Sequence, residues 1–136
     1  MGTADSELPA RMLDAWNHRD VETMISLSDP EIEYVNAPSS VEPGTRHGVD
    51  EVAEAMRKQW DVLPDARQDI DQVYERGGEI FTACRISQRM PGSGARVENR
   101  LLLSWRVRDG KVTRLAVLGG GSDFQDAFEA AGLGDA

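Results

Sequence analysis

Apolar residues recur at helical spacing in three segments of the N-terminal half of the chain. In ELPARMLDAWNHRD the apolar positions follow one another at intervals of four, one and three residues, which is typical of one helix face. A second, short helix is expected after Asp20, a residue type favoured at helix N-caps, and Asp29-Pro30 ends it. The spacing in VDEVAEAMRKQW predicts a third helix, which ends at Pro64.

Apolar and polar residues alternate with a period of two in the remaining segments, which predicts strands. Strands are expected over 31–37, 67–75, 79–89, 97–108 and 111–118. The turn signals RGG, MPGSGA and RDG separate the last four, so three hairpins in one antiparallel sheet are predicted. PSSVEPGTRHG is predicted to be a loop, and a capped helix is expected from Ser122 or Asp123 to Gly132.

This order of elements predicts an α+β fold in a single domain. With 136 residues, the chain has the length of one ordinary domain, and we expect residues 1–136 to form it. Helices followed by antiparallel strands favour a curved sheet wrapped as a cone around the N-terminal helices. The inside of a cone is concave, and such a pocket is a common binding site for small apolar molecules.

Composition and charge exclude several classes of partner. Acidic residues outnumber basic ones by 24 to 15, the net charge is -9, and no basic run alternates with aromatics, so we expect no nucleic-acid partner. Apolar runs are too short for a membrane span, and MGTADSELPA lacks the basic and apolar regions of a signal peptide. The single cysteine, Cys84, favours a reducing, cytoplasmic setting without disulfides.

The segment IEYVNAP places two polar side chains on one face of a strand. Tyr34 and Asn36 lie two residues apart, so both point to the same side, which we predict to be the interior. A phenol and an amide in an apolar interior each need a hydrogen-bonding partner. Two interpretations stay open: the pair holds a ligand or water, or the pair forms an internal structural hydrogen bond.

These elements, taken in order, resemble the NTF2-like or SnoaL-like superfamily. The resemblance rests on two helices, a strand ending near Asn36, a glycine-containing loop before a third helix, and the terminal hairpin RDGKVTRL. It covers nearly the whole chain and implies a cone that serves ketosteroid isomerase, SnoaL-type polyketide cyclases, scytalone dehydratase, limonene-1,2-epoxide hydrolase and non-catalytic binding domains. It also implies a homodimer formed through the convex sheet face, where the outward strip would be Arg100, Leu102, Ser104 and Arg106.

The residues at the catalytic positions of ketosteroid isomerase exclude that reaction. The general base and the two oxyanion-hole donors of that enzyme correspond here to Asn36, Met12 and Leu103. An amide is not a base at neutral pH, and Met and Leu donate no hydrogen bond.

Limonene epoxide hydrolase is similar in YVNAP, FTACRIS and GKVT. That resemblance implies that Tyr34 and Asn36 hold a water, and that Arg85 matches the arginine that bridges two catalytic aspartates. Ser87 and Val117 stand where those aspartates belong, so we expect no epoxide hydrolysis of the limonene type.

The candidate catalytic residues are therefore Tyr34, Asn36 and Arg85, with His47 as a weaker candidate near the expected cavity mouth. Arg85 is expected to face the cavity, and a solvated Arg85 is the alternative. The residues expected to line the pocket are Met12, Trp16, Trp60, Phe81, Ser87, Leu101, Leu103, Trp105 and Val117. Neither His18 nor His47 has a second ligand at metal-binding spacing, so no metal or other cofactor is expected.

Two functions remain open. The first is a cofactor-independent enzyme that cyclises, opens, hydrates or dehydrates a hydrophobic oxygenated substrate such as a polyketide or terpenoid. The second is a non-catalytic module that binds an apolar ligand or a protein partner. A carboxylate or histidine beside Tyr34 and Asn36 would favour the enzyme, and an uninterrupted apolar wall would favour the binding module.

Overall fold

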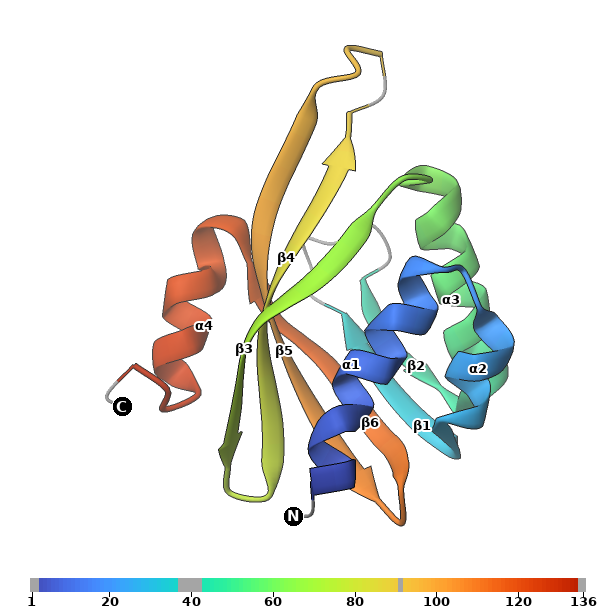
Figure 1. Cartoon of the computed structure of the whole chain (residues 1–136), viewed down its shortest axis with the longest axis vertical. Helices are drawn as coiled ribbons and strands as arrows, with labels where there is room; N and C mark the ends of the chain where they lie inside the picture. The colour runs from blue at the N-terminus through green and yellow to red at the C-terminus, as the bar shows by residue number, and fades with distance from the viewer. Residues whose placement is uncertain (1–2, 37–42, 91, 135–136) are drawn as a thin grey trace.

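Helices and strands follow the order that the sequence pattern predicts, with one additional strand. The computed structural model describes residues 3–36, 43–90 and 92–134 (Figure 1). Its elements are α1 (Thr3–Asn17), α2 (Val21–Ser26), β1 (Ser28–Asn36), β2 (Gly44–His47), α3 (Gly48–Val62), β3 (Arg67–Arg76), β4 (Glu79–Arg89), β5 (Arg96–Arg108), β6 (Lys111–Gly120), the 3-10 turn η1 (Gly121–Asp123) and α4 (Phe124–Ala130). The predicted α+β class is confirmed.

In the described part of the chain, six strands form one curved sheet that does not close into a barrel. Their order is β2-β1-β6-β5-β4-β3, and the three predicted hairpins, β3–β4, β4–β5 and β5–β6, pair in antiparallel fashion. β1 runs parallel to β6, so the sheet as a whole is mixed. β2 lies in the segment predicted to be a loop and pairs with β1 at the sheet edge. Its sequence, GTRH, has no apolar alternation to reveal a strand.

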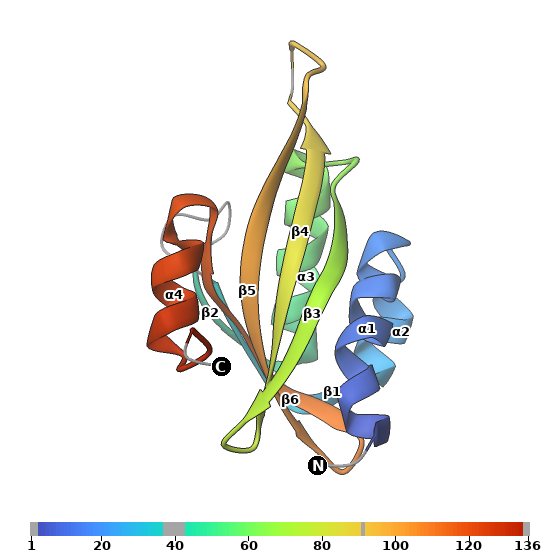
Figure 2. The same cartoon turned by 60° about the vertical axis from the view of Figure 1, so that its left-hand side comes forward.

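Three helices cover one face of the sheet, and the C-terminal helix covers part of the other (Figures 1 and 2). The main core lies between α1, α2, α3 and the concave face, where Met12, Ile32 and Trp105 are at most 2% exposed. Asp20 caps α2 as predicted, because its carboxylate accepts the Thr23 backbone N–H at 3.1 Å. None of the helices in the described part of the chain is long and apolar enough to cross a membrane.

Arg19 fastens the end of α1 to the connection between α3 and β3. Its φ of 57° is unusual for a residue other than glycine, and its guanidinium lies 5.2 Å from the Trp16 ring centroid and 5.5 Å from that of Trp60. The same group donates hydrogen bonds to the carbonyl oxygens of Ala66 at 2.9 Å and Pro64 at 2.6 Å. This clamp holds Trp16 against the interior of the cone.

The part of the convex face that carries Leu102 is buried beneath α4. Leu102 is 0% exposed and packs with Phe124 in a second apolar cluster, and Ser104 is 2% exposed. The Arg100 guanidinium lies 3.7 Å from the Phe124 ring centroid. The prediction that Arg100, Leu102, Ser104 and Arg106 form an open outward strip is therefore wrong at its centre, because a helix of the same chain covers it.

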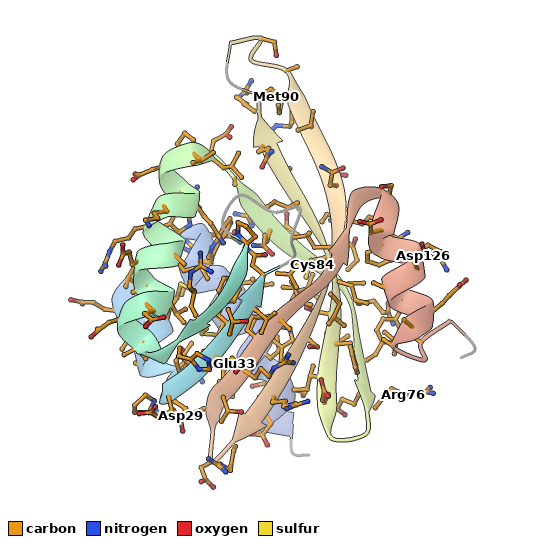
Figure 3. All side chains as sticks on the ribbon, turned by 180° about the vertical axis from the view of Figure 1, so that it is seen from behind. Asp29, Glu33, Arg76, Cys84, Met90 and Asp126 are labelled. Atoms are coloured by element: carbon orange, nitrogen blue, oxygen red, sulfur yellow. The ribbon has the colours of Figure 1, made fainter. Side chains whose placement is uncertain are left out.

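Cys84 is buried near the middle of β4 (Figure 3), with 1% of its surface exposed. Its thiol lies 3.3 Å from the Thr82 hydroxyl oxygen, and burial raises the pKa of the thiol to about 11. We expect Ellman's reagent to leave Cys84 unmodified in the native chain at pH 8 and to modify one thiol per chain in denaturant, because the reagent needs an accessible thiolate. Rapid modification of the native chain would contradict this burial.

Candidate functional site

A cavity of about 360 Å³ lies between the concave face of the sheet and helices α1 to α3. Tyr34 and Asn36 both line it, because alternate residues of β1 point to the concave side. Six of the residues predicted to line the pocket also do so: Met12, Trp16, Leu101, Leu103, Trp105 and Val117. This volume lies within the range of ordinary small-molecule pockets.

Arg85 lies outside the cavity, so its predicted inward orientation is wrong. Its side chain is 44% exposed, and its Nε lies 2.8 Å from Asp71 Oδ1 on the convex face. A second carboxylate, Glu98, lies 3.7 Å from its Nη1. The hydrogen bond to Asp71 and the two nearby carboxylates raise the pKa of Arg85. The alternative, a solvated Arg85, is the observed state, because burying a guanidinium without a partner costs several kcal/mol.

The other β4 residues shift with Arg85. Phe81 and Ser87 share its parity and do not line the cavity, and Phe81 packs instead in the cluster under α4. Ile86 and Gln88 face the cavity in their place. The residues predicted to line the cavity from this strand therefore differ by one position from those that do so. A shift of one residue exchanges the two faces of a strand.

Trp60 and His47 also lie away from the cavity. Trp60 is 9% exposed and packs in the main core, with its ring centroid 6.1 Å from that of Trp16. His47 is at the start of α3, with its Nε2 3.6 Å from Glu33 Oε2 and its side chain 67% exposed. Within the described ranges, no three His, Cys, Asp or Glu side chains are grouped as a metal site would require.

Side-chain amides gather at one end of the cavity. Strand register places Gln68 of β3 opposite Ile86 of β4, and Ile86 opposite Asn99 of β5, in one row across the sheet. Gln88 is one inward position further along β4, and Asn36 is the last residue of β1. All four amides line the cavity. This end therefore offers several neutral hydrogen-bond donors and acceptors.

The opposite end of the cavity is apolar. Leu115 pairs with Trp105 on β5 and with Tyr34 on β1, so these three residues share one row. Methionines from α1, α2 and α3 (Met12, Met24 and Met56) close this end. The Trp105 Nε1 donates to the Thr82 hydroxyl at 3.0 Å, which satisfies the indole and fixes its ring. The cavity is thus polar at one end and apolar at the other.

Tyr34 is oriented by a residue that the sequence did not indicate. Gln59 Nε2 donates to the Tyr34 hydroxyl oxygen at 2.9 Å, and both residues line the cavity. Burial raises the pKa of Tyr34 above its usual 10.0, while the hydrogen bond from Gln59 and the charge of Arg46 partly oppose this. Since the oxygen already accepts one hydrogen bond, the hydroxyl proton can be donated to a ligand. Gln59 follows Met56 by three residues, and this helical spacing was the available signal.

No charged side chain belongs to the described lining of the cavity. The lining consists of aliphatic, methionine, tryptophan, amide and glycine residues, and Tyr34 is its one titratable group. The polar contacts that this lining offers a ligand are therefore hydrogen bonds from neutral groups. Such bonds polarise a bound group but form no ion pair with it.

Comparison with known proteins agrees with this architecture. The model of a family described as the SnoaL-like domain matches residues 10–115. No curated protein sequence matches significantly. Among solved structures, TerC, co-crystallised with polyporic acid, has 22% identity and a TM-score of 0.77, with 93% of this chain and 99% of that chain covered. IdmH from Streptomyces antibioticus, a candidate polyketide cyclase, has 19% identity and a TM-score of 0.74, with 93% and 98% covered. An NTF2-like protein of unknown function from Burkholderia pseudomallei has 17% identity and a TM-score of 0.76, with 94% and 97% covered.

The environment of Tyr34 predicts its titration. The chain has two tyrosines, so a Tyr74→Phe variant isolates Tyr34 for alkaline titration by tyrosinate absorbance. We expect the midpoint to lie above 10.0, because burial disfavours the phenolate. Gln59→Leu should raise the midpoint further, because the amide N–H that stabilises the phenolate is lost. A midpoint at or below the value of the denatured chain, with circular dichroism showing a folded protein, would contradict this environment.

Proposed function

We propose that this chain, which belongs to the SnoaL-like domain family, binds a hydrophobic, oxygen-bearing small molecule in its cavity and promotes its cyclisation. The carrying observation is the Tyr34 hydroxyl, which accepts a hydrogen bond from Gln59 and so has its proton available to a ligand oxygen. The substrate class that fits best is a polyketide-like chain with several carbonyl groups, because the cavity pairs neutral amides with an apolar end.

The difference between the two cavity ends sets the orientation of the ligand. Its oxygenated part lies toward Asn36, Gln88 and Asn99, and its hydrocarbon part lies toward Trp105 and the methionines. One carbonyl oxygen accepts the hydrogen bond from the Tyr34 hydroxyl. The fixed walls then restrict the chain to the folded shapes in which its reacting carbons meet.

The lining supports a reaction in which the substrate supplies its own proton. In an intramolecular aldol closure, an enol carbon bonds to a carbonyl carbon, and the proton released by the enol oxygen completes the new hydroxyl group. Atoms and charge balance without a protein base. Tyr34 would stabilise the negative charge that develops on the attacked carbonyl oxygen, a kind of contact that strengthens in the transition state.

A non-catalytic binding module is the second candidate. It is favoured by one specific observation, the lack of any carboxylate or histidine among the described lining residues. In that case the same contacts would hold the ligand unchanged. The two candidates differ only in whether the bound molecule is converted.

Product analysis with a linear β-polyketone thioester tests the proposed function. We expect the wild-type chain to form one cyclised product faster than the spontaneous reaction, and Tyr34→Phe to reduce this acceleration at least about tenfold, because the donor to the carbonyl oxygen is lost. Arg85→Ala is the matched control, since its side chain lies on the convex face. It should react like the wild type.

The outcomes separate the two candidates. Equal acceleration by Tyr34→Phe and the wild type would overturn the proposed role of the hydroxyl. Recovery of the bound thioester unchanged would favour the binding module.

We also propose that two copies of the chain form a homodimer. The part of the convex face beyond α4 carries the exposed ion-pair group Asp71, Arg85 and Glu98, and a second copy could cover this polar surface. Light scattering should give twice the chain mass of 15.0 kDa at micromolar concentration. Arg85→Glu places three acidic side chains together and should shift the mass toward the monomer. A wild-type mass of one chain would rule the dimer out.

A further inference from the structure

A second, smaller cavity of about 20 Å³ lies directly behind the apolar end of the main one. Met12, Met24 and Met56 line both cavities and form the wall between them. The remaining lining of this side cavity is aliphatic, apart from Ser28. The Ser28 hydroxyl donates to the Met24 carbonyl oxygen at 2.7 Å, so its hydrogen bond is already made and it offers the side cavity no free donor.

The dividing wall is built from the residue type that rearranges most easily. Methionine is unbranched and has three rotatable side-chain bonds, so it changes rotamer at low cost and fills irregular space. The side cavity is about the size of one water molecule, but Ser28 is the one residue of its described lining with a polar side chain, which is too few partners to hold a water. Rotation of the methionine side chains would join this space to the main cavity.

The outer end of the side cavity lies close to the surface. Ile25 of α2 lines it and is 37% exposed, and α2 itself is only six residues long. A chain entering from the main cavity would therefore meet only a thin aliphatic layer between α2 and α3. Small shifts of this layer would therefore lengthen the cavity at its apolar end.

We propose that the side cavity is a subsite for the hydrocarbon end of the ligand, which passes between Met12, Met24 and Met56. The occupant is an unbranched alkyl chain attached to the oxygenated part of a neutral molecule, because the passage lies between three narrow side chains. This inference rests on the proposed function, since it requires that a ligand occupies the main cavity with its oxygen near Tyr34.

Straight-chain methyl ketones from 2-hexanone to 2-dodecanone are suitable probes, because each has one acceptor oxygen and a tail of known length. For the wild type, affinity measured by calorimetry should increase about fourfold per added methylene, the value for burying one such group, until the side cavity is filled. Tyr34→Phe should lower the affinity for every ketone of the series by a similar factor, because this substitution changes the main cavity alone.

Ala53→Val tests the subsite. Ala53 of α3 lines only the side cavity, so two added methyl groups fill it from behind the methionines. We expect 2-hexanone to bind as in the wild type and 2-dodecanone to bind roughly fifteenfold more weakly, as loss of two buried methylenes predicts. Ala55→Val is the matched control, because Ala55 is a buried residue of the same helix that lines neither cavity. It should keep the wild-type dependence on chain length.

Methionine-methyl NMR gives an independent measurement on the same ligands. The longer ketones should shift the methyl resonances of Met12, Met24 and Met56, and Met90 at the far tip of the β4–β5 hairpin (Figure 3) should not respond. Two results together would overturn the subsite and leave the main site intact. Short ketones would bind the wild type, and Ala53→Val would show the same dependence of affinity on chain length as the wild type. Failure of every ketone to bind the wild type would overturn both.

Discussion

Which residues of three neighbouring strands face the cavity depends on one constraint, namely which side chains of β4 point inward. This strand is buried on both faces at its start, where Phe81 and Ala83 lie under α4 while Ile80 and Cys84 face the main core. Beyond α4 the convex face reaches solvent, and there Arg85 appears. A slip of one residue would force this guanidinium into an apolar wall, at a cost of several kcal/mol. Through β4, the same parity fixes which residues of β3 and β5 point inward.

The order of elements was predictable because turn signals and periodicity are local. The RGG and RDG turns mark two hairpins without reference to the rest of the chain, and helical spacing marks α1 and α3. The inward side of β1 was also readable, since Ile32, Tyr34 and Asn36 alternate with Glu33, which is a charged residue. Because burying an unpaired charge is costly, a charged residue in a strand is a strong local indicator of the face that turns to solvent.

The parity of β4 was not readable from alternation. FTACRIS carries apolar residues at both parities because both faces are covered, so the hydrophobic pattern favours neither. The resemblance to an epoxide hydrolase supplied a register that placed Arg85 inward, whereas the cost of burying its charge indicates the opposite. Leu102 does lie on the outward face as predicted, but its burial was not readable, since its position gives no sign that α4 will cover it. Gln59 was missed because an amide on a helix is usually solvated, and its contact with Tyr34 is formed between residues 25 apart in sequence.

The separation of charge from the cavity has a consequence for how a ligand arrives. The chain carries a net charge of -9, yet its described cavity lining holds no charged group, and the pKa of Tyr34 is raised above 10.0. Under the proposed function, a neutral ligand would approach without electrostatic steering, and no charged group of the described lining would attract a competing ion. Affinity would then be governed by the volume and hydrogen-bonding pattern of the interior, and no ion pair would make it fall as salt screens charges.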